Sequence, residues 1–410
     1  MTSRSERYRA GWAARLLGGP ISALAAFALP ATGPAHAAIL DCEVQGQPVD
    51  PANGATTAGK TGVMRCVDRD TGVVVREEAL RDGKFVGMRR FFVQGKLQRE
   101  GEVNEKGNAQ GRQREFALDG TLLRDAVYNN GSVAGLALAY HLNGQLHRAS
   151  FYGAGAGNMP ASGDGGLGAT RETVVAEFTP RGQLTELRCG DRPRLAPAVD
   201  DGKLCGFSGP ADVELFDARG EIKAQMKYEQ GRMLRATYMG DNGKPVRAIE
   251  NSPGQRIERQ FWRDGSLRRE VQFEAMGSRF ERVREQEFAE QGKLQRDRHW
   301  REGRLQTDRE YYLNGQMRRE SEQVDANTIR VREYRDNGSL SGEGMFLVEA
   351  GAWRHPIGSH NVFGPDGKPT SEVVYDGRGR SVREREWDAE GKLLRDDEVF
   401  ADGSNKAFSR

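Results

Sequence analysis

The sequence predicts an all-β protein, an elongated single-layer meander of repeated β-hairpins behind an N-terminal signal peptide. Three observations lead to this prediction. Glycines recur about every twelve residues over most of the chain, which leaves room for a strand of roughly eight residues and a turn of four. Many of these glycines follow Asn or Asp, and such pairs tolerate the positive φ of tight hairpins. The residues between the turns alternate with period two, and helix signals are almost absent.

Residues 1–37 have the features of a signal peptide. Four arginines, the last of them Arg15, precede an apolar stretch at 16–29. Ala35-His36-Ala37 supplies the small residues that signal-peptide cleavage requires. The apolar stretch is short for a membrane span, with an uncleaved anchor as the alternative. Asp41 before Cys42 does not fit the small residue of a lipoprotein signal, so lipidation is rejected. The sequence therefore predicts a bacterial protein that is periplasmic or secreted.

Charge and composition exclude one broad class of function. Cleavage after residue 37 would remove four arginines and Glu6, leaving 57 basic and 58 acidic residues from the 61 and 59 of the whole chain. A nearly neutral protein is not expected to bind nucleic acid in general, which requires a basic excess on one face. Charged residues make up 29% of the chain, and the mean hydropathy is −0.70. This composition predicts a thin core, as in a single twisted sheet.

The four cysteines all follow the signal peptide. An even number of cysteines in an exported chain favours disulfides, and four cysteines allow three connectivities. We favour Cys42–Cys66 and Cys189–Cys205, because neighbours in sequence meet at the lowest entropic cost. Close Cys-x-x-Cys pairs, which zinc sites use, are absent from the sequence, so no metal is expected.

The predicted domain 38–152 begins with a disulfide-closed hairpin and continues with the clearest repeats. One pattern occurs nearly three times between residues 83 and 151: two glycines four residues apart, an aromatic residue five positions later, and then Gly-x-Leu-x-Arg. The aromatic residues of these repeats are Phe92, Phe116 and Tyr140. A Gly-rich segment at 153–170 is predicted to be a linker that separates this array from a second one.

The second predicted array covers 171–410 and contains a Pro-rich cysteine loop at 189–205. Turn glycines with the same rhythm continue from Gly220 to Gly403. Residues 349–363, which carry Trp353, His355 and His360, are predicted to form a longer connection between strands.

The repeat pattern resembles that of a known family. The pattern Gly-Lys-x-x-Gly, an aromatic residue, and Gly-x-Leu-x-x-Glu is similar to the MORN-repeat variant family, whose bacterial members include YwqK-type antitoxins. The resemblance covers roughly 71–403, is strongest in the first three repeats, and weakens at 216–346, where the second glycine is missing. It implies an elongated run of hairpins that acts by contact and not by catalysis.

Two nucleotide-binding patterns occur, and neither has the required context. Residues 54–61 match the P-loop pattern, but turn-forming residues precede them and a hairpin is predicted after them, in place of a strand and a helix. Residues 163–168 match a dinucleotide fingerprint, but a predicted strand follows. We interpret both matches as accidental and expect no cofactor.

No catalytic constellation is predicted. His141 and His147 flank one turn, and His355 and His360 share a segment without a third ligand. Carboxylates alternate with arginines, which favours cross-strand ion pairs on a solvated face, each worth at most about 1 kcal/mol. The candidate contact stripe, or else the repeat core, consists of the repeated aromatic residues Phe92, Phe116, Tyr140, Phe261, Tyr312, Phe363 and Trp387.

The resulting expectation is an exported, non-enzymatic repeat protein that binds a protein partner through an extended sheet. The alternative is a module that binds an envelope ligand, either a lipid headgroup or a peptidoglycan glycan. Nucleic acid is not expected as a partner, and the oligomeric state stays open.

Overall fold

The chain is almost entirely β-structure. A computed structural model describes residues 39–154, 170–349 and 352–407. Apart from two four-residue helices, α1 (Gly54–Thr57) and α2 (Asp201–Leu204), its elements are antiparallel strands. Among these residues, no helix has the length and apolar character needed to cross a bilayer. The predicted all-β class is confirmed, whereas the predicted signal peptide at 1–37 lies outside the described residues.

The strands form two sheets. The first contains β1 (Leu40–Val44), β2 (Gln47–Val49), β3 (Gly62–Asp68), β4 (Val74–Arg81), β5 (Lys84–Val93), β6 (Lys96–Val103), β7 (Ala109–Phe116), β8 (Leu122–Asn129), β9 (Ser132–Tyr140), β10 (Leu146–Ala154), β11 (Thr170–Phe178) and β12 (Leu184–Arg188).

The second sheet is the longer one. It contains β13 (Ala211–Phe216), β14 (Ile222–Glu229), β15 (Arg232–Met239), β16 (Pro245–Ser252), β17 (Gln255–Phe261), β18 (Leu267–Met276), β19 (Arg279–Phe288), β20 (Leu294–Arg301), β21 (Arg304–Tyr311), β22 (Met317–Asp325), β23 (Thr328–Tyr334), β24 (Leu340–Glu349), β25 (Ala352–Phe363), β26 (Pro369–Tyr375), β27 (Ser381–Trp387), β28 (Leu393–Val399) and β29 (Asn405–Ala407).

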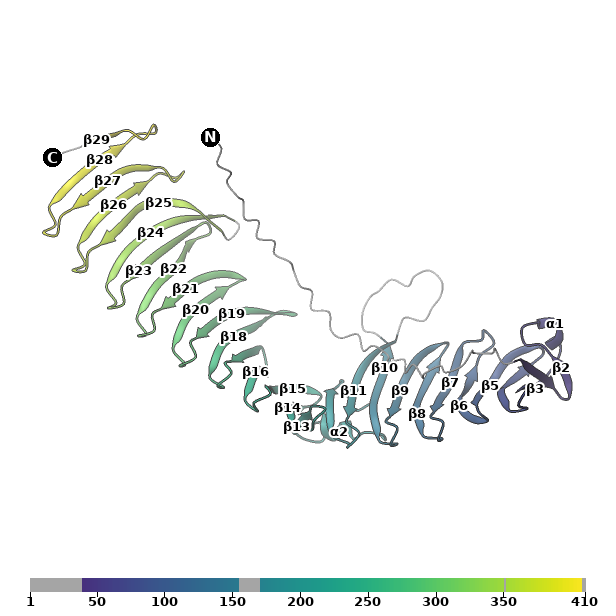
Figure 1. Ribbon diagram of the computed structural model, residues 1–410. Coiled ribbons are helices and arrows are strands. Elements are labelled where there is room, and N and C mark those ends of the chain that lie inside the picture. Colours follow the sequence, from purple (N-terminus) through teal and green to yellow (C-terminus); the bar gives the residue numbers. More distant parts are fainter. Residues whose placement is uncertain (1–38, 155–169, 350–351, 408–410) are drawn as a thin grey trace, which may run out of the picture.

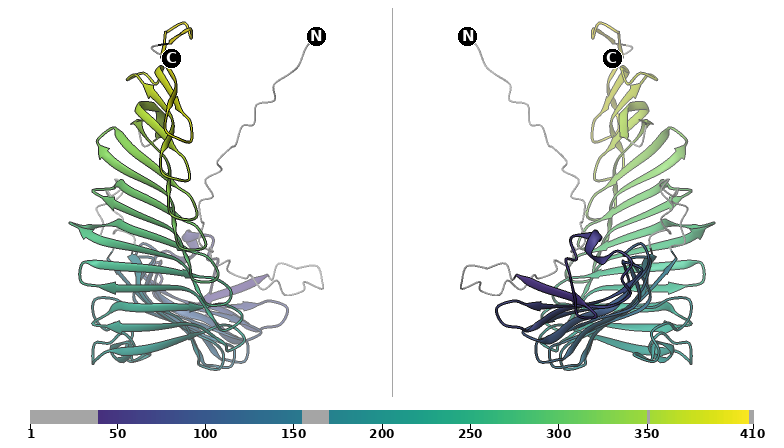
Figure 2. Two further views of the ribbon diagram at one scale, coloured as in Figure 1. Left: turned by 90° about the vertical axis from the view of Figure 1, so that its left-hand side faces the viewer. Right: turned by 90° about the vertical axis from the view of Figure 1, so that its right-hand side faces the viewer.

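Each sheet is a meander, as the sequence predicted. The spatial order of the strands follows their order in the chain, except that β1 lies between β2 and β3. Figure 1 shows two curved single layers that meet at an angle near α2 and β13. In Figure 2 the strands of the second sheet stack as one layer with their turns along two edges. The predicted long connection at 349–363 is wrong, because strands β24 and β25 occupy most of it.

The alternation in the sequence places apolar residues on one face of a strand. In β14, Ala224, Met226 and Tyr228 are buried, while Gln225 and Lys227 between them are exposed. This pattern follows from the pleat, which turns successive side chains to opposite faces. The same property explains how a chain with few apolar residues still builds long strands.

The change of sheet does not occur at the predicted linker. Strands β10 and β11, on either side of it, pair with each other from Arg148↔Glu177 to Ala154↔Thr170. The first sheet therefore continues through β12, and the break between the sheets lies at 189–210. The sequence suggested 153–170 because of its glycine content, but the pairing of the flanking strands does not depend on the composition of the segment between them.

The largest hydrophobic core lies where the two sheets meet. This junction core combines buried residues from β10 to β15 with Leu195, Val199 and Cys205 of the connecting loop. Leu195 is fully buried, and the Cys189–Cys205 disulfide closes the loop around it. The predicted pairing of Cys42 with Cys66 is also confirmed, and this disulfide belongs to a smaller core at the N-terminal end. The predicted thin core is therefore concentrated at two places.

The two edges of the meander carry different turns, because successive hairpins reverse at opposite edges. One edge carries mostly two-residue turns such as Asp82-Gly83 and Gln230-Gly231, in which both residues have positive φ. The other edge, here called the aromatic edge, carries the turns at 94–95, 117–121, 141–145 and 179–183 of the first sheet and at 217–221, 240–244, 262–266, 289–293, 312–316, 335–339, 364–368 and 388–392 of the second.

Candidate binding surface

All seven repeated aromatic residues lie at the aromatic edge and are half-buried. Most of them pair across their hairpin with the leucine of the Gly-x-Leu sequence, as in Phe116↔Leu122 and Tyr140↔Leu146. One position differs from the prediction: Tyr311, and not Tyr312, occupies the strand position opposite Met317. Half-burial leaves part of each ring on the surface while the rest covers the hairpin partner.

Neighbouring turns of the aromatic edge are joined by hydrogen bonds. In each bond, one partner is the side chain of the residue directly after the aromatic strand end. The other partner is the backbone carbonyl oxygen of the last strand residue before the next turn along this edge. Examples are His141 with Phe178 at 2.9 Å, Trp262 to Phe288 at 3.1 Å and Tyr312 to Tyr334 at 2.9 Å.

A second series of bonds runs beside the first. The side-chain amides of Asn143, Asn242 and Asn314 donate to the carbonyls of Pro180, Arg263 and Asp336 in the next turns. Sequence reasoning missed both series, although the Asn-Gly pairs were a signal that could have found the second. These bonds therefore brace several pairs of neighbouring turns along the aromatic edge.

The loop that matches the P-loop pattern is a cap on the N-terminal end of the first sheet. The Asn53 side chain accepts from the N–H of Ala55, and the Asn53 carbonyl accepts from the N–H of Thr56. These backbone amides are therefore engaged inside the loop, whereas a phosphate cradle needs them free. The four-residue α1 falls inside the matching residues, and strand β3 follows them. The geometry does not fit the mechanism behind the motif.

Lys60→Ala in this loop is expected to give the same result as the wild type in any nucleotide-binding assay. The Lys60 ammonium donates to the side chain of Gln47 at an exposed position, so the loss in stability should stay within about 0.5 kcal/mol. Calorimetric titration with ATP–Mg²⁺ and urea unfolding check both points. Binding by the wild type that Lys60→Ala abolishes would contradict the interpretation of the motif as accidental.

The charged residues form the predicted cross-strand pairs, but the predicted solvated environment is wrong for part of them. Seven carboxylates in the described residues are buried. Asp201 accepts from the backbone N–H groups of Arg194 and Leu195. The other six are each paired with at least one arginine side chain: Glu78, Glu100, Asp125, Glu285, Asp297 and Asp396. The arginine side chains lie across the sheet and cover the carboxylates, which alternation in the sequence alone does not reveal. Removing one partner of such a buried pair costs more than breaking an exposed one.

Glu285 on β19 is the most heavily paired of these carboxylates. It is 3% exposed and lies 2.9 Å from Arg269, 2.6 Å from Arg282 and 3.6 Å from Arg298. Burial by itself would raise the pKa of Glu285, but the hydrogen bonds from Arg269 and Arg282 and the charge of Arg298 outweigh it. The pKa is held below its usual value. The same balance of burial against the Arg284 guanidinium lowers the pKa of Asp297.

Acidification is therefore expected to weaken the second sheet. A carboxylate whose pKa is lower in the folded state stabilises the protein above its unfolded pKa, about 4.3 for Glu and 3.9 for Asp. That stabilisation is lost as the pH falls through the depressed folded value. We expect Glu285→Gln to destabilise the protein at pH 7 and to have a much smaller effect at pH 3. Urea unfolding of wild type and variant at both pH values measures this; a difference that does not shrink at pH 3 would contradict it.

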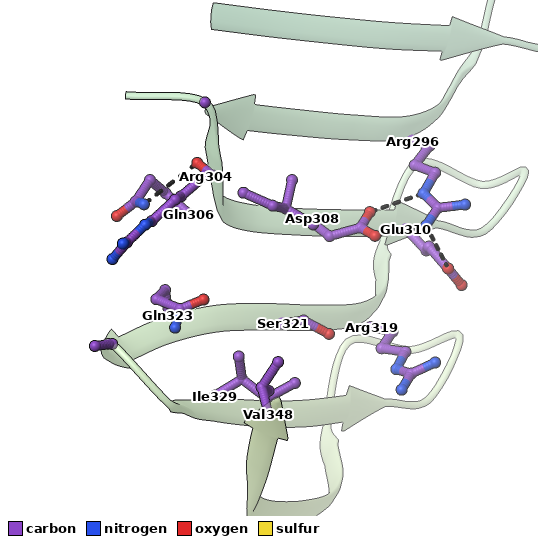
Figure 3. Close-up of a pocket in the computed structure, with 13 residues that line it drawn as sticks. Arg296, Arg304, Gln306, Asp308, Glu310, Arg319, Ser321, Gln323, Ile329 and Val348 are labelled. Carbon is purple, nitrogen blue, oxygen red and sulfur yellow. Dashed lines mark hydrogen bonds and ion pairs between the residues drawn. The ribbon is translucent and has the colours of Figure 1, made fainter. Parts of the chain in front are cut away.

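An open groove of about 570 Å³ crosses the face of the second sheet between β20 and β24. Figure 3 shows its lining side chains. Ile329 and Val348 provide apolar side chains at one side of the groove, and the amide of Gln323 lies near them. Leu305 and Gln306 also belong to the lining. Sequence reasoning did not find this groove, because its lining comes from four consecutive hairpin strands and the end of β24.

The other end of the groove is ionic. The Arg296 guanidinium lies 2.5 Å from Asp308 and 3.9 Å from Glu310, and Figure 3 places Arg319 nearby. The small side chain of Ser321 lies opposite Asp308 and leaves room in the middle. The groove therefore offers apolar contacts, amide donors and acceptors, and charges of both signs in one line.

The histidines do not assemble a metal site in the described residues, where no group of three or more ligating side chains is found. The rings of His141 and His147 lie 4.4 Å apart, and His141 already bonds the carbonyl of Phe178. His360 packs edge-on against Phe346 and Tyr375, and its Nε2 lies 2.8 Å from the carbonyl of Met345. Each of these rings has a structural contact.

Comparisons with known proteins do not assign a family. No family model matches the chain, and no curated protein matches it. Among solved structures, a mutant of S. aureus TarM shares 13% identity over 25% of this chain with a TM-score of 0.19, and the chain spans only 19% of that protein. The Photorhabdus luminescens Tc holotoxin pore shares 10% identity over 85% of this chain and 24% of its own, with a TM-score of 0.17. Similarities this weak carry no argument about function.

Proposed function

We propose that this chain is a non-enzymatic binding protein that holds a segment of a partner protein in the groove of the second sheet. The observation that supports this proposal is the groove itself. It is an open trough lined by apolar side chains, two side-chain amides and paired charges. A polypeptide is the ligand that this combination fits, because it presents apolar side chains, backbone N–H and C=O groups and charges along one line.

The size of the groove supports a short segment. A volume of about 570 Å³ lies within the range of roughly 300–1,000 Å³ that ligand sites have in proteins. Gln306 and Gln323 each carry a donor and an acceptor that can pair with a peptide backbone. The Arg296–Asp308 pair already neutralises its own charges, so charge is not the main source of affinity here.

The proposed location is the periplasm or the medium. The two disulfides in the structure are consistent with an oxidising compartment. The resemblance to the MORN-repeat variant family extends the proposal to an antitoxin-like or immunity-like role, in which the partner would be a harmful protein.

A blocked groove tests the proposal. Partners are captured by cross-linking from cells that export the protein, purified, and titrated against the wild type and Ser321→Trp, in which an indole ring would fill the middle of the groove. We expect the variant to bind at least about tenfold more weakly. Ser359→Trp, at an exposed serine of β25 outside the groove, is the matched control and should bind like the wild type.

Two outcomes would overturn the proposal. One is a purified protein partner whose affinity is the same for wild type and Ser321→Trp. The other is the absence of any direct protein partner together with sedimentation on liposomes or peptidoglycan that Ser321→Trp abolishes, which would favour the envelope-ligand alternative.

A further inference from the structure

A second, smaller hollow lies on the same face of the second sheet as the groove. It has a volume of about 220 Å³, is lined by residues of β22 to β25, and shares Arg319 with the ionic end of the groove. Ser321 of the groove pairs with Val331, which pairs with Gly344, and directly opposite residues turn to one face. The hollow, here called the glycine pocket, therefore continues the groove toward β25.

Two glycines of β24, Gly342 and Gly344, lie on this face. Glycine inside a strand weakens a sheet, and it often marks a bulge or a place where another group approaches closely. The position of Gly344 has both reasons. The pairing of β24 with β25 shifts between Glu343 and Met345. A Cβ atom on Gly344 would also lie 2.3 Å from Nδ1 of His360, so the imidazole ring occupies the space above this glycine.

No neighbour among the described residues explains Gly342 in the same way. A Cβ atom there would meet only the carbonyl oxygen of Asn361, at 3.4 Å, and the φ of Gly342 lies outside the left-handed region. The strand therefore has room for a larger side chain at this position. Its absence leaves bare backbone at the bottom of the pocket, which a flat ring can cover, as aromatic side chains cover glycines in sheets.

The walls of the pocket are apolar and aromatic. Val331 is buried, Phe346 is half-buried and Val362 is 49% exposed, so part of this apolar surface faces solvent. The His360 ring is held in place, because it packs edge-on against Phe346 with ring centroids 4.9 Å apart and its Nε2 lies 2.8 Å from the Met345 carbonyl oxygen. Walls that are already fixed reduce the entropy lost when a ligand binds.

The rim of the pocket is charged. The Arg319 guanidinium lies 4.0 Å from the carboxylate of Glu333, and Glu333 is exposed. A ring that enters between the apolar walls brings its outer edge to this rim, where the hydroxyl of a tyrosine can donate to the Glu333 carboxylate. The pocket therefore suits a side chain with an apolar body and an edge that tolerates water.

We propose that the glycine pocket holds an aromatic side chain, phenylalanine or tyrosine, of the same partner segment that lies in the groove. From the strand spacing and register, Ser321 and Gly342 are roughly 12 Å apart. An extended chain covers this distance in about three or four residues. Aromatic anchors in pockets commonly contribute most of the binding energy of an interface. This inference rests on the proposed function, because it takes the ligand to be a protein segment, and it adds the residue that this segment must carry.

Small amides test the pocket without a known partner. The full protein with both disulfides formed is titrated with the N-acetyl amides of phenylalanine, tyrosine and alanine, and binding is measured from the NMR signals of the amide. We expect the two aromatic amides to bind and the alanine amide not to bind. Gly342→Leu, which places an isobutyl group on the bare backbone, should weaken binding of the aromatic amides at least about tenfold.

Two further variants serve as controls. Ser359→Leu adds the same side chain at an exposed position of β25 outside the pocket and should bind the amides like the wild type. Gly342→Ala adds only the Cβ atom for which the strand has room. It should keep the urea midpoint of the wild type or raise it, and weaken binding several-fold, so it decides the question even if Gly342→Leu does not fold. Aromatic amides that bind Gly342→Ala and the wild type equally, or that bind no better than the alanine amide, overturn the inference.

A groove partner separates this inference from the proposed function. A purified partner that loses affinity in Ser321→Trp, but binds Gly342→Leu as it binds the wild type, overturns the glycine pocket as a site for that partner and leaves the proposed function intact. Aromatic amides that bind in the pocket while the groove has no protein partner have the opposite meaning: they support the pocket as a site for an aromatic ring and overturn the proposed function.

Discussion

Replacing Gly231 with alanine is expected to unfold the junction between the two sheets. Gly231 has φ +76°, and a Cβ atom there would lie 2.2 Å from the carbonyl oxygen of Gly190 and 2.8 Å from the ring of Phe207. The Gly231 N–H also donates to the carbonyl of Cys205 at 2.9 Å, so the turn cannot move aside without losing this bond. We expect a loss of more than about 3 kcal/mol in urea unfolding.

A second glycine isolates the cause. Gly254 has the same φ of +76°, but a Cβ atom there would meet nothing within 4 Å. Gly254→Ala therefore tests the backbone conformation alone and is expected to cost about 1–2 kcal/mol. Equal losses in the two variants would show that the contact with Gly190 is not what matters.

Leu195→Ala is expected to have the next largest effect, about 2–5 kcal/mol, because it leaves a cavity at a fully buried position. Leu195 belongs to the core that combines β10–β12 with β13–β15. Its loss should therefore reduce hydrogen-exchange protection in both sheets near the junction, and leave β4–β6 and β26–β28 protected, since strands in such arrays depend mainly on their neighbours.

The control is Leu142, which is 71% exposed at a turn of the aromatic edge. Leu142→Ala should change stability by no more than about 0.5 kcal/mol. Loss of protection confined to one sheet in Leu195→Ala would contradict a shared junction core. It would instead fit two sheets that are stable independently of each other, with the division at 189–210.

Much of the candidate surface follows from the repeat pattern. The spacing from a turn glycine to Phe116 or Tyr140 is regular in the sequence, and in the structure both residues lie at the same edge, each opposite a leucine. The position of Tyr311 could have been predicted, because Tyr311 lies four residues before Gly315, the spacing that the aromatic residue has in most of the other repeats, whereas Tyr312 lies three before it. The groove could not be predicted, since it depends on the side chains of neighbouring strands that meet on one curved face.

The sequence by itself determined the all-β class and the meander order of most strands, and it favoured the two disulfide pairs that the structure contains. The class and the order depend on turn glycines and period-two alternation, which act within a few residues, and the favoured disulfides close short loops. Tertiary structure alone decided where the first sheet ends and which carboxylates are buried. Leu195 and Glu285 acquire their environments from strands and loops that the chain brings alongside them. Burial and pairing there depend on sheet curvature and on side-chain packing, which no local pattern encodes.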